Sequence, residues 1–494
     1  MSDKKYIAAF DFGTGSVKAA LIGLDATVLA HAGGTYPLLT PQSGWAEQRP
    51  EDHWQGVCSA CRSAVAKGGI APEDVVGVVF GGMWKGVVPV DKNGSVLHNA
   101  IIWLDARSEK QARELNEKLH TDFFCAAEYW PRLLWLKENE PEAYENAEWI
   151  LENISYLAYR ATGNAGTALS NCMTSSLKPE LDERYRTYIR AAELDESKFP
   201  PCRLPWDKVG GLTEKSAADM GLCPDTPVFA GCGDIPAVTV GSGAGANGAA
   251  HIYMGSSGWL AITVPERVAG VGEHYSSLDD KKEIRLYTMQ SVCLAFDWAV
   301  RTFYKKEWEE LGDGIYGLIE KELAEIPAGC GGLIATPWLY GERNPLSGNA
   351  RGLYFNINSL HDRRHFVAAM QEGIAYMLRM KLETYYAEGG APLPLIHVVG
   401  GATGSARWMQ TLCDVLQVPL EVPAGARHAG ALGTAYCAMI GLGVARDFEE
   451  ANQIIRTERR YEPREENRAV YEKNYQQFVK LFPQLEQLFD TMNG

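Results

Sequence analysis

The first residues suited to chemistry form a turn near the N-terminus, Asp11-Phe-Gly-Thr-Gly-Ser-Val-Lys18. Gly13 and Gly15 allow the backbone to turn tightly, so its N–H groups can face a phosphate, and Thr14 adds a hydroxyl donor. Asp11 ends an apolar segment and is placed to hold Mg²⁺ through water, because this ion keeps much of its hydration shell. A plain β-hairpin turn with glycines at positive φ would give the same pattern, so this motif alone leaves both interpretations open.

A second candidate is the aspartate that ends Gly231-Cys-Gly-Asp234, which follows the apolar segment Pro227 to Ala230. An aspartate after a strand and a glycine turn is placed to reach into a cleft. Phosphoryl transfer needs such a carboxylate to orient the nucleophilic hydroxyl and accept its proton. The structural alternative is that Asp234 caps a helix beginning near Ile235.

Two glycine turns in the second half of the chain complete the set. Gly255-Ser-Ser-Gly258 separates two apolar segments, as the N-terminal turn does, so a triphosphate would sit between the two turns. In Val398-Val-Gly-Gly-Ala-Thr-Gly404, Gly400 and Gly401 permit the flat approach of a purine ring or ribose. The structural alternatives are a hairpin turn and a strand-to-helix crossover with small residues for packing.

The elements that must position these turns alternate between strands and helices, which predicts an α/β fold. The valine-rich run Val75 to Phe80 is typical of a buried strand, and Glu51 to Ala66 has apolar residues at helical spacing. Further strands are expected at Tyr6 to Phe12, Val17 to Leu24 and Thr27 to His31, and helices at Arg364 to Ala387, Ser405 to Leu416 and from about Arg464.

The order strand, small-residue turn, strand occurs twice, around Asp11–Ser16 and around Gly255–Gly258. This weak repeat indicates two similar domains, each of which offers a turn to a shared cleft. The joint is expected near the glycine-rich stretch at 241–248, so we predict one domain at 1–245 and a second at 246–494.

Composition excludes several classes of partner. The formal net charge of −15 over 494 residues argues against nucleic acid and anionic membranes, but allows an anionic ligand held by backbone N–H groups. No signal peptide or membrane-spanning run is visible, and the 11 scattered cysteines do not resemble a secreted disulfide framework. Cys58 and Cys61 form a CxxC within a predicted helix and are better interpreted as buried thiols than as half of a zinc site. A reduced, cytoplasmic protein is expected.

In their order along the chain, the four motifs resemble the FGGY carbohydrate kinase family. Two further stretches support the resemblance, Tyr129-Trp-Pro-Arg-Leu-Leu-Trp-Leu-Lys-Glu-Asn139 and Tyr340-Gly-Glu-Arg-Asn-Pro345, and together the motifs cover nearly the whole chain. The resemblance implies two ribonuclease-H-like domains of the actin/hexokinase type, with an interdomain ATP cleft and a small sugar as the substrate. The domain at 1–245 would bind the sugar and carry the catalytic base, and the domain at 246–494 would bind the nucleotide.

The same resemblance implies roles for individual residues. Asp234 would be the general base that activates the sugar hydroxyl, and Asp11 would help to hold Mg²⁺. The residues expected to bind ATP are Gly13, Thr14, Gly255, Ser256, Gly400, Gly401 and Ala402.

Within the family the chain most resembles the xylulose kinases, through the segments 44–48 (GWAEQ) and 103–107 (WLDAR), so a keto-pentose is the expected substrate. Trp84, Lys85, Trp103 and Asp105, together with Asp234, are expected at the sugar. The chain departs from those kinases where Trp84-Lys85-Gly86 replaces Met-His-Gly. A lysine only donates and adds positive charge, which would suit a sugar acid, whereas a long stem that carries the charge to solvent would have no such effect.

Alternatives from other functional classes stay open. A non-catalytic sugar sensor would be expected to lose Asp11 and Asp234, both of which are present, and an ATPase of the actin or chaperone type would lack the stretches at 129–139 and 340–345. The sequence does not give the oligomeric state, and a homodimer is one of the options.

Overall fold

A computed structural model describes residues 4–176, 178–267, 270, 272–279, 281–343 and 346–493. Two residues of the predicted 340–345 motif, Asn344 and Pro345, lie outside them. The chain forms two compact units. Unit 1 consists of Met1–Gly241, Ser276–Lys281 and His428–Ile454, and unit 2 of Ser242–Tyr275, Lys282–Arg427 and Ile455–Gly494.

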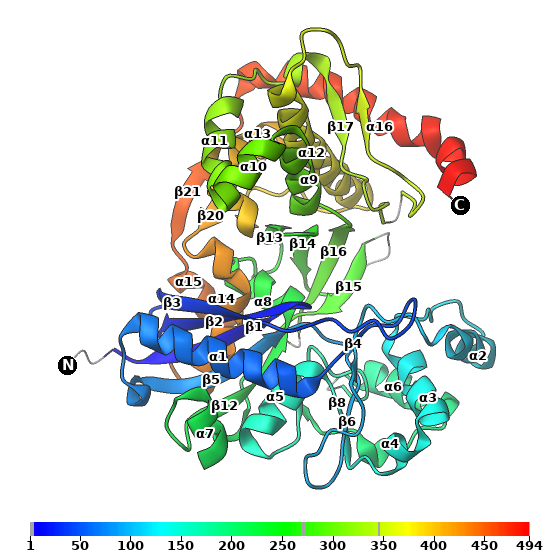
Figure 1. Ribbon diagram of the computed structural model, residues 1–494, viewed down its shortest axis with the longest axis vertical. Coiled ribbons are helices and arrows are strands. Elements are labelled where there is room, and N and C mark those ends of the chain that lie inside the picture. Colours follow the sequence, from blue (N-terminus) through cyan, green and yellow to red (C-terminus); the bar gives the residue numbers. More distant parts are fainter. Residues whose placement is uncertain are drawn as a thin grey trace. The chain divides into compact units, whose positions relative to one another are not determined.

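Unit 1 is built on a six-stranded sheet in the order β11-β12-β5-β1-β2-β3 (Figure 1). The strands are β1 (Tyr6–Phe12), β2 (Ser16–Gly23), β3 (Val28–Thr35), β5 (Val75–Gly82), β11 (Lys208–Gly211) and β12 (Pro227–Gly233). β1 and β2 form an antiparallel hairpin, while β1, β5 and β12 run parallel to one another. Every residue of β5 but one is buried, which explains its unbroken apolar sequence.

Helices cover both faces of this sheet. Helix α1 (Pro50–Gly68) begins with proline at its first turn and buries Trp54 and Val57 against Phe10 and Phe12 of β1. Because side chains alternate across a strand, Asp11 lies on the opposite face, where its carboxylate is next to Gly430 of α14 (Ala429–Gly441). The buried thiols of Cys58 and Cys61 lie in α1, as expected, and burial raises the pKa of each to about 12.

Helix α14 crosses α8 (Asp234–Gly241) at close range. A Cβ atom added to Gly433 of α14 would overlap the carbonyl oxygen of Ala237, and one added to Gly241 would overlap that of Ala429. Two glycines therefore let the two helix backbones touch. This crossing fixes the position of α8, whose first residue is Asp234.

A second layer of unit 1 forms around a separate apolar core that includes Trp130, Leu133 and Trp135 of α3 (Tyr129–Asn139). The remaining elements of this unit are β4 (Glu47–Gln48), β6 (Val88–Val90), β7 (Ala100–Ile101), α2 (Glu109–Leu119), α4 (Pro141–Glu145), β8 (Trp149–Leu151), α5 (Asn153–Thr162), β9 (Thr167–Ala168), α6 (Pro179–Ala191), β10 (Cys202–Arg203), α7 (Glu214–Met220) and α15 (Phe448–Ile454).

Unit 2 contains a seven-stranded sheet in the order β15-β16-β14-β13-β19-β20-β21. The strands are β13 (Ala250–Met254), β14 (Gly258–Val264), β15 (Glu273–Ser276), β16 (Glu283–Met289), β19 (Ile396–Val399), β20 (Leu420–Pro423) and β21 (Thr457–Tyr461). β13 forms an antiparallel hairpin with β14 and pairs in parallel with β19. This repeats the β1–β2–β5 arrangement of unit 1, so the two similar domains expected from the paired turns are present.

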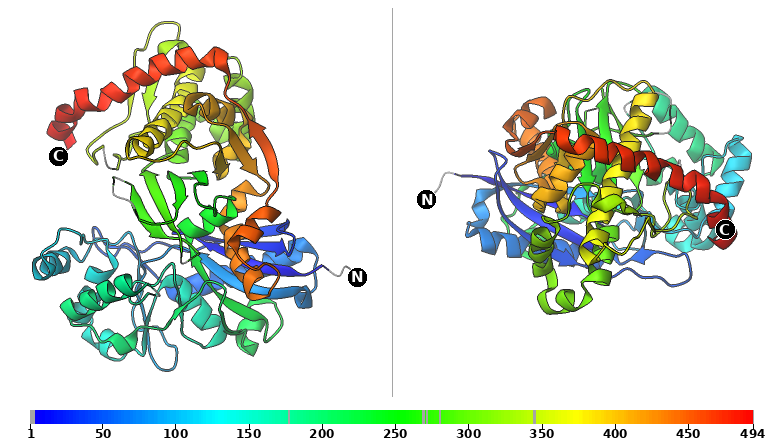
Figure 2. Two further views of the ribbon diagram at one scale, coloured as in Figure 1. Left: turned by 180° about the vertical axis from the view of Figure 1, so that it is seen from behind. Right: turned by 90° about the horizontal axis from the view of Figure 1, so that it is seen from above.

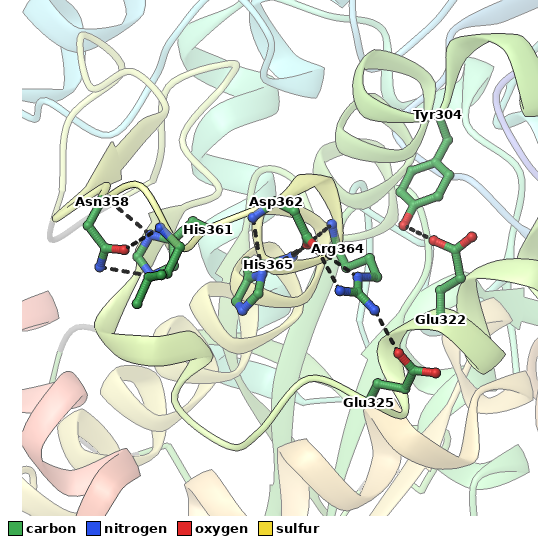
Figure 3. Close-up of polar contacts among 9 residues, drawn as sticks. Tyr304, Glu322, Glu325, Asn358, His361, Asp362, Arg364 and His365 are labelled. Atoms are coloured by element: carbon green, nitrogen blue, oxygen red, sulfur yellow. Dashed lines mark hydrogen bonds and ion pairs between the residues drawn. The ribbon is translucent and has the colours of Figure 1, made fainter.

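Helix α12 (Arg363–Ala387) of unit 2 begins with a capping box. The Asp362 side chain accepts the N–H of Arg364 at 3.0 Å, and His365 Nδ1 accepts the N–H of Asp362 at 3.2 Å (Figure 3). These bonds satisfy donors that the first helical turn leaves free. The observed start lies one residue before the predicted one.

The other helices of unit 2 are α9 (Cys293–Phe303), α10 (Lys305–Leu311), α11 (Ile315–Leu323), α13 (Ala406–Leu416) and α16 (Glu465–Asn493), with the short strands β17 (Ile334–Thr336) and β18 (Leu353–Phe355). α16, red in both views of Figure 2, packs on α12 and α13. Among the described residues, no helix is long and apolar enough to cross a membrane.

Candidate active site

Three parallel strands of unit 1 end at one edge of the sheet and bring distant motifs together. In the register of the sheet, Gly81 of β5 lies opposite Asp11 of β1 on one side and opposite Cys232 of β12 on the other. Asp11, the segment that follows β5, and Asp234 therefore all lie at this edge. Such carboxyl ends of parallel strands are where open α/β sheets bind their ligands.

The carboxylates of Asp11 and Asp234 influence each other. Burial raises the pKa of Asp234 to about 7, and the negative charge of Asp11 adds to this shift, while the N–H of Ile235 opposes it. Burial also raises the pKa of Asp11, which the charge of Lys18 partly offsets. Both side chains keep some exposure to solvent, so a ligand can reach them. A carboxylate poised near neutrality suits a general base.

Asp234 also makes one hydrogen bond of the kind expected if it capped a helix. Its Oδ1 accepts the N–H of Ile235 at 2.8 Å in the first turn of α8. The backbone just before it is fixed by the N–H of Gly233, which donates to Ser170 Oγ at 3.0 Å. One carboxylate oxygen thus anchors the side chain to the helix, and this anchoring does not compete with proton acceptance at Oδ2.

Three side chains hold the N-terminal turn in place by hydrogen bonds. Tyr36 donates to the carbonyl of Gly13, Gln48 donates to the carbonyl of Thr14, and Trp103 Nε1 donates to Thr14 Oγ1 at 3.1 Å. Neither Gly13 nor Gly15 has a positive φ, and a Cβ atom at Gly15 would meet open space. The hairpin conformation therefore does not require these glycines, and a phosphate that approaches the backbone closely does.

Lys85 has a third environment, which neither expectation described. Its Nζ lies 3.0 and 3.1 Å from the two carboxylate oxygens of Glu128, and each side chain is 19% exposed. Lys85 has a φ of 62°, which is uncommon for a residue other than glycine. The backbone N–H of the following residue, Gly86, donates to Glu152 Oε2 at 3.2 Å. The sequence motif at 129–139 begins directly after Glu128, but no pattern indicated this pair.

Trp103 and Asp105 occupy different environments. Trp103 is 38% exposed beside Thr14, where it can cover a ligand on the turn. Asp105 is fully buried, and its oxygens accept hydrogen bonds from the N–H of Ala46 at 2.6 Å and from the Arg107 guanidinium at 2.8–3.0 Å. Direct sugar binding by Asp105 stays a prediction, and these contacts favour an indirect role.

Arg107 connects Asp105 to the segment that carries Trp45. Its guanidinium also binds Glu47 Oε1 at 2.7 Å and lies 3.7 Å from the ring centre of Trp45. A second ring, that of Trp135, lies 4.6 Å from the same guanidinium. Arg107 and Glu47 were not among the predicted site residues, although both belong to the segments that resemble the xylulose kinases.

Replacing Asp105 by Asn is expected to lower the free energy of unfolding by about 1–3 kcal/mol, because it removes a carboxylate that several buried donors share. Urea unfolding measures this change. If Asp105 acts indirectly, its replacement changes stability more than the KM for the sugar. A large rise in KM with unchanged stability would instead favour direct sugar binding.

Unit 2 offers a corresponding edge. Tyr253 of β13 lies opposite Val399 of β19, so the turn at 255–258 and the turn at 400–402 follow neighbouring parallel strands. Ser256 is exposed, and its carbonyl accepts the N–H of Val292 at 3.0 Å. A Cβ atom at Gly401 would meet open space, which leaves its backbone accessible to a flat ligand, and Ala402 is buried beneath the turn.

Comparison with known proteins agrees with this architecture. The family model described as the N-terminal domain of the FGGY family of carbohydrate kinases matches residues 6–241, and the model of the C-terminal domain matches residues 250–442. Over 98% of both chains, the sequence is 28% identical to a xylulose kinase of Bacillus subtilis. It is 27% identical to an L-xylulose/3-keto-L-gulonate kinase of Escherichia coli, with 91% of both chains covered.

Solved structures share the fold. A xylulose kinase from Lactobacillus acidophilus superposes with a TM-score of 0.84 at 20% identity, covering 99% of this chain and 100% of that one. A gluconate kinase from the same organism gives a TM-score of 0.83 at 20% identity with the same coverage. At this identity the likeness concerns the fold alone.

Proposed function

The chain belongs to the FGGY family of carbohydrate kinases, and we propose that it transfers the γ-phosphate of ATP to a hydroxyl of a keto-pentose such as xylulose. The observation that carries this proposal is the placement of Asp234 and Asp11 at one sheet edge, beside a backbone turn in which Gly15 faces open space. The names of the relatives at 26–28% identity support xylulose as the first sugar to test.

In the proposed reaction, Asp234 orients the sugar hydroxyl and accepts its proton while the hydroxyl oxygen bonds to the γ-phosphorus. The bond from that phosphorus to the bridging oxygen breaks, and ADP leaves with the electron pair. Thr14 binds phosphate oxygens through its backbone N–H group and its hydroxyl, and Gly13, whose own N–H donates to the Ser16 carbonyl at 2.9 Å, lets them approach the backbone closely. We assign further contacts with ATP to Gly255, Ser256, Gly400, Gly401 and Ala402 of unit 2.

The carboxylate pair fits a divalent cation. The negative charge of Asp11 disfavours ionisation of Asp234, and a nearby cation would relieve this repulsion. We therefore propose that Asp11 holds Mg²⁺ through water. The ion, when bound, supplies positive charge that neutralises the phosphate oxygens.

The sugar would lie where the segment after β5 meets Asp234. Gly82, at the end of β5, pairs with Gly233, so Trp84 and Lys85 follow within three residues at this place, and Trp103 contacts the N-terminal turn through Thr14. We assign these three residues to the sugar site, with Asp105 and Arg107 behind them. The predicted division into a sugar-binding domain at 1–245 and a nucleotide-binding domain at 246–494 stays a proposal about roles.

We also place the enzyme in the reduced cytoplasm. All 11 cysteines are free, and the Cys437 thiol donates a hydrogen bond to the Cys232 sulfur at 3.8 Å instead of forming a disulfide with it. Light scattering will test whether it forms a homodimer.

The proposed function is tested by ADP release across a panel of pentuloses, hexuloses, polyols and sugar acids. Xylulose or a related keto-pentose is expected to give the highest kcat/KM, with little ADP release when sugar is omitted. Fast ADP release without sugar would support an ATPase instead. Binding of sugar without any ADP release would support a sensor.

A further inference from the structure

The positive charge of Lys85, in the segment after β5 that we call the sugar segment, is neutralised by another residue of the protein. Lys85 follows β5 by three residues, at the edge where Asp11 and Asp234 lie, and both oxygens of Glu128 bind its Nζ. Since a carboxylate at 3.0 Å cancels the lysine charge, this lysine does not present a free positive charge to a substrate.

Glu128 is committed to this pair by its place in the fold. It directly precedes α3, at the position where a side chain commonly caps the helix, yet its side chain makes no capping hydrogen bond. Lys85 is also held, because its φ of 62° and the bond from Gly86 to Glu152 fix the course of the segment. The backbone at the start of α3 and the backbone of the segment after β5 therefore hold Glu128 and Lys85 next to each other.

The other charged groups around this pair are also matched. Arg132, four residues into the same helical region, donates to the Glu128 carbonyl at 3.3 Å, and burial lowers its pKa to about 10. It faces the carboxylates of Glu152, Glu128 and Asp105, and burial holds the pKa of Glu152 well above its usual range. Arg107 is likewise bound by Glu47 and Asp105. The surroundings of the sugar segment therefore have no excess of positive charge to offer a carboxylate, while Asp11 and Asp234 would repel one.

We propose that Glu128 determines the charge selectivity of the sugar site, so that the enzyme phosphorylates uncharged sugars and rejects sugar acids. This inference rests on the proposed kinase function and on the sugar binding beside Lys85. Glu128 acts by occupying Lys85, and its removal would leave a lysine that can bind a substrate carboxylate. Glu128, which discriminates against sugar acids in this way, lies 43 positions along the chain from Lys85.

The test compares a neutral sugar with an acid of the same length, xylulose and xylonate. The inhibition constant of xylonate against xylulose turnover, divided by the KM for xylulose, measures selectivity even when the acid is not phosphorylated. Glu128→Gln is expected to lower this ratio at least about tenfold, because it exposes one positive charge at short range. The double variant Glu128→Gln/Lys85→Met is expected to lose that gain.

Glu138→Gln is the matched control. Glu138 lies in the same helix α3, pairs with Lys110 at 3.5 Å, and loses the same charge in this variant, so the ratio is expected to stay at the wild-type value. Glu128→Asp keeps the charge and is expected to keep most of the selectivity. Thermal unfolding of each variant identifies any that fails to fold; if Glu128→Gln is among them, Glu128→Ala takes its place, with the same expected fall in the ratio.

Two results would overturn the inference: an unchanged ratio in folded Glu128→Gln, or a wild-type preference for xylonate. In both cases ATP-dependent sugar phosphorylation would still be observed. Failure of the proposed function gives a different outcome, in which wild type releases no ADP with any sugar of the panel.

Discussion

Replacing Asp234 by Asn is expected to lower kcat by at least about 1000-fold, because the variant cannot accept the proton of the sugar hydroxyl. The amide keeps the size of the side chain and its hydrogen bond to Ile235 N–H through Oδ1. ATP affinity, measured by calorimetry, is therefore expected to stay within a few-fold of wild type. Asp313→Asn, at an exposed position in unit 2, is the control. A kcat near that of wild type would reject the role given to Asp234.

The raised pKa of Asp234 also predicts how pH acts on activity and stability. Activity should fall as pH decreases through about 7, since protonation removes the base. Stability behaves in the opposite way. The folded carboxyl has a pKa of about 7 against an ordinary value of 3.8, so it holds a proton that the unfolded chain has lost between these values, and stability falls as pH rises through this window.

Asp234→Asn should therefore be more stable than wild type at pH 8, by up to about 4 kcal/mol, with the difference vanishing near pH 4. Urea unfolding without ATP or Mg²⁺ at the two pH values measures this. A catalytic group that weakens the fold in this way is a familiar trade between activity and stability. Equal stability at pH 8 would show that the folded protein does not disfavour the charged carboxylate.

Replacing Gly433 by Ala is expected to lower the free energy of unfolding by more than about 3 kcal/mol. The new methyl group would overlap the backbone carbonyl of Ala237, which, unlike a side chain, cannot rotate away. Because α8 begins at Asp234, separating α8 from α14 should also move the base, so kcat should fall in protein that still folds. Urea unfolding and ADP release measure the two effects.

Gly317 of α11 provides the matched control for this change. It is also a helical glycine, but a Cβ atom there meets open space. Gly317→Ala is expected to be neutral or to stabilise by up to about 1 kcal/mol, since alanine favours the helix. Similar effects of the two substitutions would show that the crossing of α8 and α14 is looser than described.

Much of the local structure followed from the sequence. The strand Tyr6–Phe12 has the predicted bounds, and α1 extends the predicted helix 51–66 only to 50–68, because both have clear apolar periodicity and short-range signals at their ends. The sequence also placed Asp11 and Asp234 each at the end of an apolar segment, whereas their gathering at one sheet edge is seen only in the parallel pairing of β1, β5 and β12.

What the sequence did not reveal depends on contacts between distant segments. The pairing of Lys85 with Glu128 joins a loop to a helix start, and no periodicity links them. The sequence does not show that Asp105 is buried, and its contact with Arg107, which also binds Glu47, is what favours an indirect role. The packing of α14 in unit 1 depends on the fit of two glycines, which by pattern alone weaken a helix.

Because α14 belongs to unit 1 but lies late in the sequence, unit 1 cannot complete its fold until α14 has been synthesised. Its residues are translated about 200 positions after Gly241, which at typical rates of synthesis is about 10–40 s later. Until then, the face of the sheet that carries Asp11 lacks α14, the helix that packs on β1, β5 and β12. We therefore expect that a ribosome-bound chain ending before residue 441 stays sensitive to proteases and phosphorylates nothing, and that the proposed base becomes functional only after α14 has been made.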